Sequence, residues 1–208
     1  MKNPIQFLAI ALAISVVSVL ASDGNRMPPI SPEKYDAAQR KVAEEFLQAR
    51  KVPIFGPYDV LIRSPEFMGV VRQMGDYLRF KPAIGTTLSE FIILMVARQW
   101  SQDYEWYVHA PIAAKQGIKQ DIINALAEGR RPSGMSDDET ILYDFIDELG
   151  RNRCVSDGTY DRAVKRFGEQ GVVDITGLAG NYTLIAMILN VSRTPIPSDG
   201  MKLPRLPD

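Results

Sequence analysis

Apolar side chains recur at intervals of three and four residues along most of this chain, which is the periodicity of an α-helix packed on one side. Helices are expected at about 32–50, 65–80, 87–100, 102–115, 119–128, 136–150, 156–167 and 172–191. No two segments alternate in the way that paired strands do. The pattern therefore predicts an all-α fold of seven or eight helices.

Several helix starts carry a recognisable signal. Ser31-Pro32-Glu33 and Ser64-Pro65-Glu66 each place a capping serine before a proline in the first turn. Ser136 and Glu139 have the spacing of a capping box. The stretch 51–58 (KVPIFGPY) holds two prolines and a glycine, so it is expected to break the chain between helices. Five residues of the helix at 65–80 are expected to face the core: Phe67, Val70, Val71, Met74 and Leu78.

Two of the helices are unusually apolar. The segment 87–100 is apolar nearly all round, which predicts a buried helix. The segment 172–191 is long enough to cross a membrane, but Asp174, Asn181 and Asn190 interrupt it and two glycines weaken it. A helix buried in the fold is therefore expected there, and no stable membrane span.

The two ends of the chain differ from its middle. Lys2, the apolar run 5–20 and the small residue Ala21 are typical of a signal peptide cleaved after residue 21, which predicts a secreted or periplasmic protein. An uncleaved anchor is the alternative. Residues 22–54 form a lead-in and a helix, 55–192 the main domain, and 193–208 a proline-rich tail that is expected to wrap a neighbour or stay loose.

Composition narrows the functional classes. The 208 residues are 46% hydrophobic and 24% charged, which fits one domain with a substantial core. The net charge is -1 and no block of Lys or Arg occurs, so nucleic acid is not an expected partner and a small molecule is. The single cysteine, Cys154, cannot form an internal disulfide, and we expect it to be a small apolar residue near a helix end.

The candidate chemistry centres on the only histidine. Glu105 and His109 are four residues apart, so both side chains project from one helix face and can form a proton-transfer pair. Glu90 lies in the buried apolar helix, where an unpaired carboxylate would be costly. On one straight helix Glu90 and Glu105 would be about 22 Å apart, so they can share a site only if the chain bends at 100–103. The alternatives are a surface ion pair and a core histidine.

Other kinds of site have weaker support. Glu90, Glu105 and His109 could supply three metal ligands, but the chain has no HExxH motif, and a site without metal or cofactor is expected. It has no dinucleotide-binding glycine motif after a strand, no Walker A loop and no GxSxG. Arg79 and Arg98 flank apolar helices and could bind a substrate carboxylate.

The run Ser89–Trp100, followed by Tyr104-Glu105-Trp106 and His109, resembles the carboxymuconolactone decarboxylase and alkylhydroperoxidase D-like superfamily. The likeness extends over about 55–192. In the redox branch the site is a glutamate, a Cys-x-x-Cys pair and a histidine. By position, Gln102 and Glu105 replace the two cysteines, so both thiols are missing. The resemblance implies an all-helical bundle that forms a homo-oligomer, commonly a trimer or hexamer, with sites near subunit contacts.

What remains is the decarboxylase-like branch, and the resemblance implies a carboxy-lyase that acts on a small carboxylate- or lactone-bearing compound by decarboxylation or isomerisation. Glu105 and His109 would be the acid/base pair and Glu90 an orienting group. Arg79, Arg98, Tyr104, Gln102 and Tyr182 are the candidates for substrate contact. The alternatives are a metal-assisted lyase or hydrolase using the same three residues, a peroxidase relative that has lost its cysteines, and a non-enzymatic oligomer that binds a small molecule.

Overall fold

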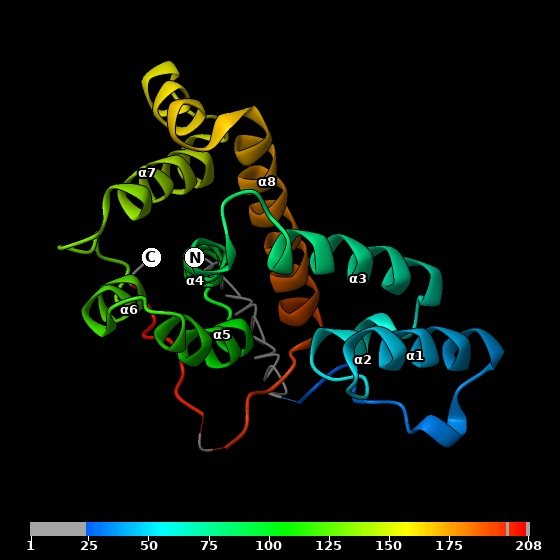
Figure 1. The fold of residues 1–208 in the computed structure, drawn as a ribbon. Helices are drawn as coiled ribbons and strands as arrows, with labels where there is room; N and C mark the ends of the chain where they lie inside the picture. Colours follow the sequence, from blue (N-terminus) through cyan, green and yellow to red (C-terminus); the bar gives the residue numbers. More distant parts are fainter. Residues whose placement is uncertain (1–23, 199, 207–208) are drawn as a thin grey trace, which may run out of the picture.

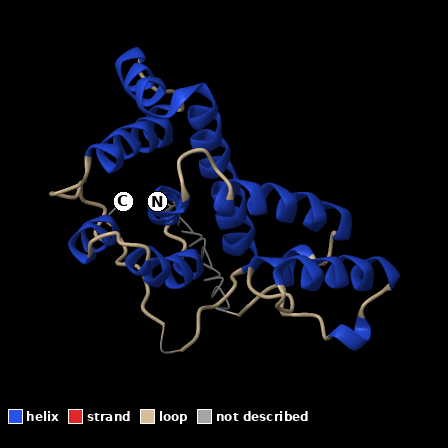
Figure 2. Ribbon diagram, in the orientation of Figure 1, coloured by secondary structure: helices blue, strands red, loops and turns tan. Residues whose placement is uncertain are grey.

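The computed structural model describes residues 24–198 and 200–206, and every regular element in these ranges is a helix (Figure 2). The all-α prediction is confirmed. The expected signal peptide, 1–21, lies outside the described residues. In chain order the elements are the 3-10 helix η1 (Pro32–Lys34) and the α-helices α1 (Ala37–Arg50), α2 (Pro57–Leu61), α3 (Pro65–Phe80), α4 (Thr86–Gln99), α5 (Asp103–Lys115), α6 (Gln120–Ala127), α7 (Asp137–Asn152) and α8 (Asp157–Ser192).

The fold is built around α4. Residues 89–98 of this helix are all buried, as its apolar pattern predicts. Figure 1 shows α4 end-on in the middle of the bundle, and it packs against α3, α5, α6, α7 and α8. Because α4 has no solvent face over most of its length, any charged group on it must find a partner inside the protein.

Two apolar clusters meet along α8. The larger one surrounds α4 with side chains from α5, α6, α7 and α8, and it includes Trp106 and Tyr182. The smaller one lies between α1, α2, α3 and the last turns of α8, and it includes Tyr58 and Ile185. Tyr182 and Ile185 are three residues apart on α8, so the junction of the two clusters lies beside this part of the helix.

The first helix begins later than the sequence predicts. Ser31 makes no side-chain cap. The extended backbone of Tyr35 (ψ 138°) ends η1, so this short helix does not continue into α1. Asp36 caps α1 instead: its carboxylate accepts from the Gln39 backbone N–H at 2.8 Å, and its own N–H donates to the Gln39 side chain at 3.0 Å. The stretch 51–58 was expected to contain no helix, but α2 begins within it, at Pro57. The capping box of Ser136 and the start of α3 after Ser64 are confirmed.

The buried face of α3 is rotated from the expected one. Phe67, Val70 and Met74 are exposed, and only Val71 and Leu78 of the five expected residues are buried, together with Met68 and Gly75. The helix packs against α1, α2, α4 and α8 on one side and leaves the other side to solvent. The apolar pattern of this segment therefore predicts that a helix forms, but it does not predict which face of the helix is buried.

The last helix and the tail also differ from expectation. The two predicted helices at 156–167 and 172–191 are joined through a kink at Gly168, whose φ of 71° and ψ of 172° are not helical. Among the described helices, α8 is long and apolar enough to cross a membrane by length and composition, and half of its most apolar window is buried inside the protein. The tail packs on its own chain, because Leu203 is buried and its N–H donates to Asp103 at 3.0 Å. Cys154, expected near a helix end, lies just after the end of α7, and it is exposed.

Candidate functional site

The candidate site depends on the corner between α4 and α5. Ser101 takes a left-handed backbone (φ 47°), and the chain reverses at this point as the sequence predicts. The cap of α5 is Gln102, whose side-chain oxygen accepts from the Tyr104 backbone N–H at 2.6 Å. The reversal packs α5 against α4, and the residues that α5 buries include Glu105 and His109.

Glu90, His109 and Glu105 meet inside the protein. His109 Nδ1 lies 2.6 Å from Glu90 Oε2, and His109 Nε2 lies 3.4 Å from Glu105 Oε2. The three residues are 1%, 4% and 4% exposed, so the contacts are shielded from water. Arg79 of α3 adds a fourth member, because its Nε donates to Glu90 Oε1 at 3.1 Å. The structure thus forms a row of ionisable groups in the order Arg79, Glu90, His109, Glu105.

The pKa values of the two carboxylates in this row are shifted in opposite directions. Burial opposes the charged form of Glu90, but the hydrogen bond and charge of His109 and the charge of Arg79 outweigh it and lower its pKa. Burial raises the pKa of Glu105, and the attraction of His109 and Arg79 only partly offsets it. Two neighbouring acids whose pKa values are pushed apart are the usual arrangement for acid/base chemistry.

This difference assigns a role to each nitrogen of His109. The charged Glu90 accepts a hydrogen bond, so it holds the proton on Nδ1 and fixes the plane of the ring. Nε2 then faces Glu105, which can hold a proton of its own because burial favours its neutral form. A proton can therefore pass between Glu105 and Nε2 while Glu90 stays ionised.

A small cavity of about 50 Å³ opens beside Glu105 and His109. Its walls come from α2, α3, α5 and α8, and Arg50 at the end of α1 also contributes. Ligand sites usually measure about 300–1,000 Å³, whereas this cavity suits a water molecule or one small functional group. A larger substrate therefore requires one wall to move.

One wall is held closed by a glycine. Gly56 has a φ of 60°, and a Cβ placed there would be 2.7 Å from the Tyr104 hydroxyl oxygen. Only glycine lets the segment before α2 lie against Tyr104 at this distance. Tyr104 lines the cavity, as a candidate for substrate contact should, and so does Phe55 from the segment before α2.

Both tyrosines proposed for substrate contact lie at the cavity. The Tyr182 ring packs edge-on against the His109 ring with 5.2 Å between their centroids. Burial raises the pKa of Tyr104 to about 12, and it raises the pKa of Tyr182 well above its usual value. Both phenols therefore stay protonated and can donate hydrogen bonds.

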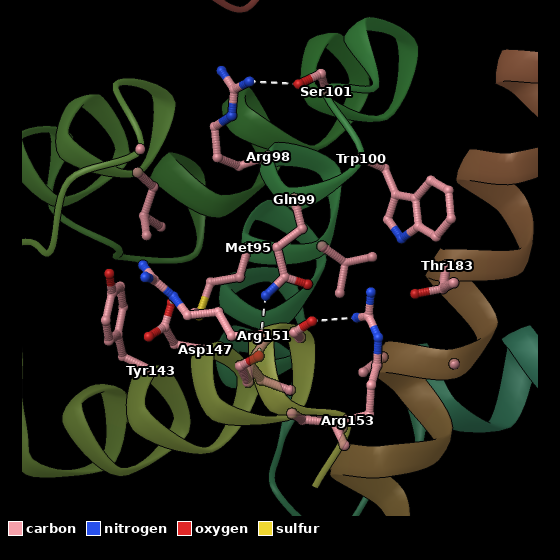
Figure 3. Close-up of a pocket in the computed structure, with 18 of the residues that line it drawn as sticks. Met95, Arg98, Gln99, Trp100, Ser101, Tyr143, Asp147, Arg151, Arg153 and Thr183 are labelled. Carbon is pink, nitrogen blue, oxygen red and sulfur yellow. Dashed lines mark hydrogen bonds and ion pairs between the residues drawn. The ribbon is translucent and has the colours of Figure 1, made fainter. Parts of the chain in front are cut away.

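Arg98 and Gln102 are not brought to the cavity. Arg98 donates to the carbonyls of Ala127 and Pro204 at 3.0 and 2.7 Å and to the Ser101 hydroxyl at 2.6 Å, so it ties the corner to the tail (Figure 3). Gln102 donates to Asn190 at 2.8 Å. Arg98 is eight residues beyond Glu90, which is about 12 Å along the helix and about 80° around it. The proposal of Arg98 as a carboxylate clamp for this site was therefore wrong.

Figure 3 shows a larger cavity, of about 650 Å³, between α4, α7 and α8. Its carboxylate, Asp147, is paired with Arg151 at 2.8 Å, and Gln99 donates to the Ile146 carbonyl at 3.0 Å. It is lined by residues 176, 179, 180 and 183 of α8, whereas residues 181, 182 and 185 line the smaller one. At 100° per residue these two sets lie on nearly opposite sides of α8. The larger cavity holds no imidazole, and we therefore place the candidate site at the smaller one.

Three residues of the cavity were not anticipated. Arg50 donates to Asp76 at 2.9 Å and to the Tyr58 hydroxyl at 3.1 Å. Asn181 is 4% exposed, and its side-chain oxygen has no hydrogen-bond partner among the described residues. The signal for Asn181 was present in the sequence, because it interrupts an apolar helix. Arg50 and Tyr58 come from elements whose packing the sequence does not specify.

Comparisons of the chain with protein-family models, with curated proteins and with solved structures find no match. The superfamily resemblance stays a prediction carried by the residues quoted above.

Replacing Glu105 with glutamine is expected to raise the melting temperature at neutral pH. Burial raises the pKa of Glu105 in the folded state above its ordinary 4.5, so this group contributes stability below that pH and loses the contribution as the pH rises through the raised pKa. Glutamine has no charged form. The advantage of the variant over the wild type should thus be near zero at about pH 4 and should grow toward about pH 8.

Circular dichroism melts at a series of pH values measure this difference. The control is Glu45→Gln, which changes the same group on the exposed face of α1. An advantage of Glu105→Gln that does not change with pH would contradict the buried, charge-sensitive role of Glu105.

Proposed function

We propose that this protein is a cofactor-free acid/base enzyme, similar in chemistry to carboxymuconolactone decarboxylase, that acts on a small carboxylate or lactone by proton transfer with decarboxylation or isomerisation. The observation that carries the proposal is the contact of His109 with two buried carboxylates, Glu90 at 2.6 Å and Glu105 at 3.4 Å, beside a cavity. The pKa of one carboxylate is lowered and that of the other is raised, which is the arrangement that an acid/base pair needs.

The proposed step moves one proton and one electron pair. Loss of CO2 breaks the bond between the carboxylate carbon and its neighbour, and the electron pair of that bond passes to the neighbouring carbon and its conjugated carbonyl. His109 Nε2, which has taken up the proton of Glu105, then donates it to that carbon, and a water molecule supplies the proton that returns Glu105 to its neutral form. In an isomerisation, neutral Nε2 first removes the proton and then returns it to another carbon. Glu90, held by Arg79, stabilises the imidazolium in both cases.

The terminal nitrogens of Arg79 are available to the substrate. Its Nε bonds Glu90, and its Nη1 and Nη2 have no hydrogen-bond partner among the described residues. Arg79 lines the cavity, so its two free nitrogens can bind a carboxylate in the fork geometry that guanidinium favours. Of the two arginines that the sequence suggests as clamps, Arg79 therefore suits the role.

The geometry gives less support to the alternatives. Within the described residues, no three His, Cys, Asp or Glu side chains are placed to hold one metal ion. Both nitrogens of His109 face carboxylate oxygens, which suits a proton relay better than metal ligation. A thiol peroxidase needs a cysteine at the site, but Cys154 is exposed at the end of α7. The oligomer implied by the resemblance stays a prediction, which light scattering of the purified protein would test.

The proposed reaction can be tested without knowing the natural substrate. Small carboxylates and lactones are incubated with the purified protein in deuterated water, with and without a chelator, and followed by NMR. We expect deuterium to enter at the carbon next to a carbonyl, or labelled CO2 to leave, and the rate to be unaffected by the chelator. A protein that exchanges no C–H proton and releases no CO2 from any of these compounds would contradict the proposal.

A further inference from the structure

Asn181 presents a buried polar atom that the protein itself does not use. It lies on α8 with 4% of its surface exposed, and its Oδ1 has no hydrogen-bond partner in the part of the chain that the structure describes. Buried side-chain oxygens in native proteins nearly always have a donor. Asn181 lines the cavity that contains Glu105 and His109, so the missing donor can come from a molecule bound there.

Two further polar groups, from Tyr58 and Arg50, lie near the Asn181 amide at the same end of the cavity. A Cβ built on Gly75 of α3 would be 3.7 Å from Asn181 Nδ2, 3.8 Å from the Tyr58 hydroxyl and 3.9 Å from Arg50 Nη2. Groups from α8, α2 and the end of α1 thus approach one glycine in the middle of a helix. Glycine at such a position weakens the helix relative to alanine. Its use here keeps space open between the three groups.

These groups would bind most favourably a ligand that carries both a carboxylate and a hydroxyl. The free nitrogens of Arg79 are donors, and they match the oxygens of a carboxylate. The Oδ1 of Asn181 is an acceptor, and it matches a hydroxyl. A simple carboxylate or a lactone offers only acceptors and would leave Oδ1 without a partner. A hydroxy acid satisfies both, and it enters when a wall of the cavity moves, as the volume of about 50 Å³ requires for any ligand larger than one functional group.

We propose that Asn181, Gly75, Tyr58 and Arg50 form a specificity subsite for the hydroxyl of a small hydroxy carboxylate, with Arg79 binding the carboxylate. That this ligand is the substrate rests on the proposed acid/base function. The subsite orients the compound so that the carbon next to its carboxylate lies toward His109, which lines the same cavity.

The test uses three small anions measured by titration calorimetry on the full chain: glycolate, acetate and methoxyacetate. Acetate lacks the hydroxyl of glycolate, and methoxyacetate keeps the oxygen but cannot donate. We expect glycolate to bind about tenfold more tightly than either of the others, which is the contribution of one hydrogen bond to an otherwise unpaired buried oxygen. In Asn181→Leu, which replaces the amide by an apolar group of similar size, the three anions should bind with equal affinity.

Gly75→Ala provides a second variant that touches no charged group. Its methyl group would make ordinary contacts with the Asn181, Tyr58 and Arg50 atoms, so the fold should tolerate it while the space for the hydroxyl is lost. Glycolate binding should weaken about tenfold. Gly69→Ala is the matched control, because it lies inside the same helix and meets only Val42, at 4.0 Å. It should leave glycolate binding unchanged.

Equal binding of glycolate and acetate to the wild type, no binding of any of the three, or a preference that survives in Asn181→Leu would each overturn the subsite. These outcomes can be told apart from failure of the proposed function. A protein that prefers glycolate but exchanges no C–H proton of any compound refutes the acid/base function and leaves the subsite standing. A protein that exchanges protons and treats glycolate and acetate alike refutes the subsite alone.

Discussion

Replacing His109 with alanine is expected to lower kcat/KM by a factor of about 10²–10⁴, which is the usual contribution of a positioned acid/base group. His109 is the residue that joins Glu90, whose pKa is lowered, to Glu105, whose pKa is raised, so its loss removes the group that transfers the proton. The helical content should be kept, because the residues of α4 that form the core do not depend on the imidazole. Deuterium exchange into the substrate measures the loss, and circular dichroism checks the fold.

The matched control for His109→Ala is Tyr107→Phe. Tyr107 lies on the same helix but is 37% exposed, and its activity should equal that of the wild type. Imidazole added to His109→Ala should restore part of the rate, since the variant leaves a vacant space of matching shape beside Glu105. Undiminished turnover in His109→Ala would show that the row of groups is structural and would remove the proposed mechanism.

Replacing Glu90 with glutamine should have the largest effect on stability. The carboxylate is 1% exposed and pairs with both Arg79 at 3.1 Å and His109 at 2.6 Å, so its loss leaves a partly buried guanidinium without its counter-charge. Removal of one partner of a buried pair costs about 3–5 kcal/mol. For a domain of this size, a loss of about 3 kcal/mol corresponds to a fall in Tm of about 6–12 °C. Activity should fall as well, because the amide no longer fixes the proton on Nδ1.

The pH dependence of this effect has a definite sign. The pKa of Glu90 is lowered in the folded state, so the stability it contributes is present above the ordinary value of 4.5 and is lost as the pH falls through the lowered pKa. The difference in Tm between the wild type and Glu90→Gln should therefore be full at neutral pH and should shrink in acid. A difference that stays constant down to about pH 3 would contradict the ionised state of Glu90.

Asp174→Asn is the matched control for Glu90→Gln. Asp174 is also a buried carboxylate, but it accepts from the Ala83 N–H at 2.8 Å and the Tyr77 hydroxyl at 3.2 Å and does not line the cavity. Its replacement should lower the Tm without the loss of activity expected for Glu90→Gln. If both variants retained full activity, the contact between Glu90 and His109 would have no catalytic role.

The sequence predicted the helices well where their pattern and caps agree. The apolar run of α4 specified a central helix, and the Ser136 capping box specified the start of α7. Prediction failed where short-range signals compete: Ser31-Pro32-Glu33 resembles a helix start, yet the chain leaves the helical region at Tyr35 and Asp36 caps α1 instead. On α3, exposed and buried apolar residues look alike in sequence, and only the positions of α1 and α8 decide which face is covered.

For the candidate site, the sequence by itself determined the i,i+4 pair of Glu105 and His109 and the cost of burying Glu90 without a partner, because both follow from helix geometry and burial along one chain. The tertiary structure alone decided that Arg79 pairs with Glu90, that Arg98 ties the tail, and that Asn181 and Gly75 face the cavity. These groups come from helices far apart in the sequence. Their distances depend on how α3 and α8 pack against α4 and α5, and no periodicity within a single helix carries that information.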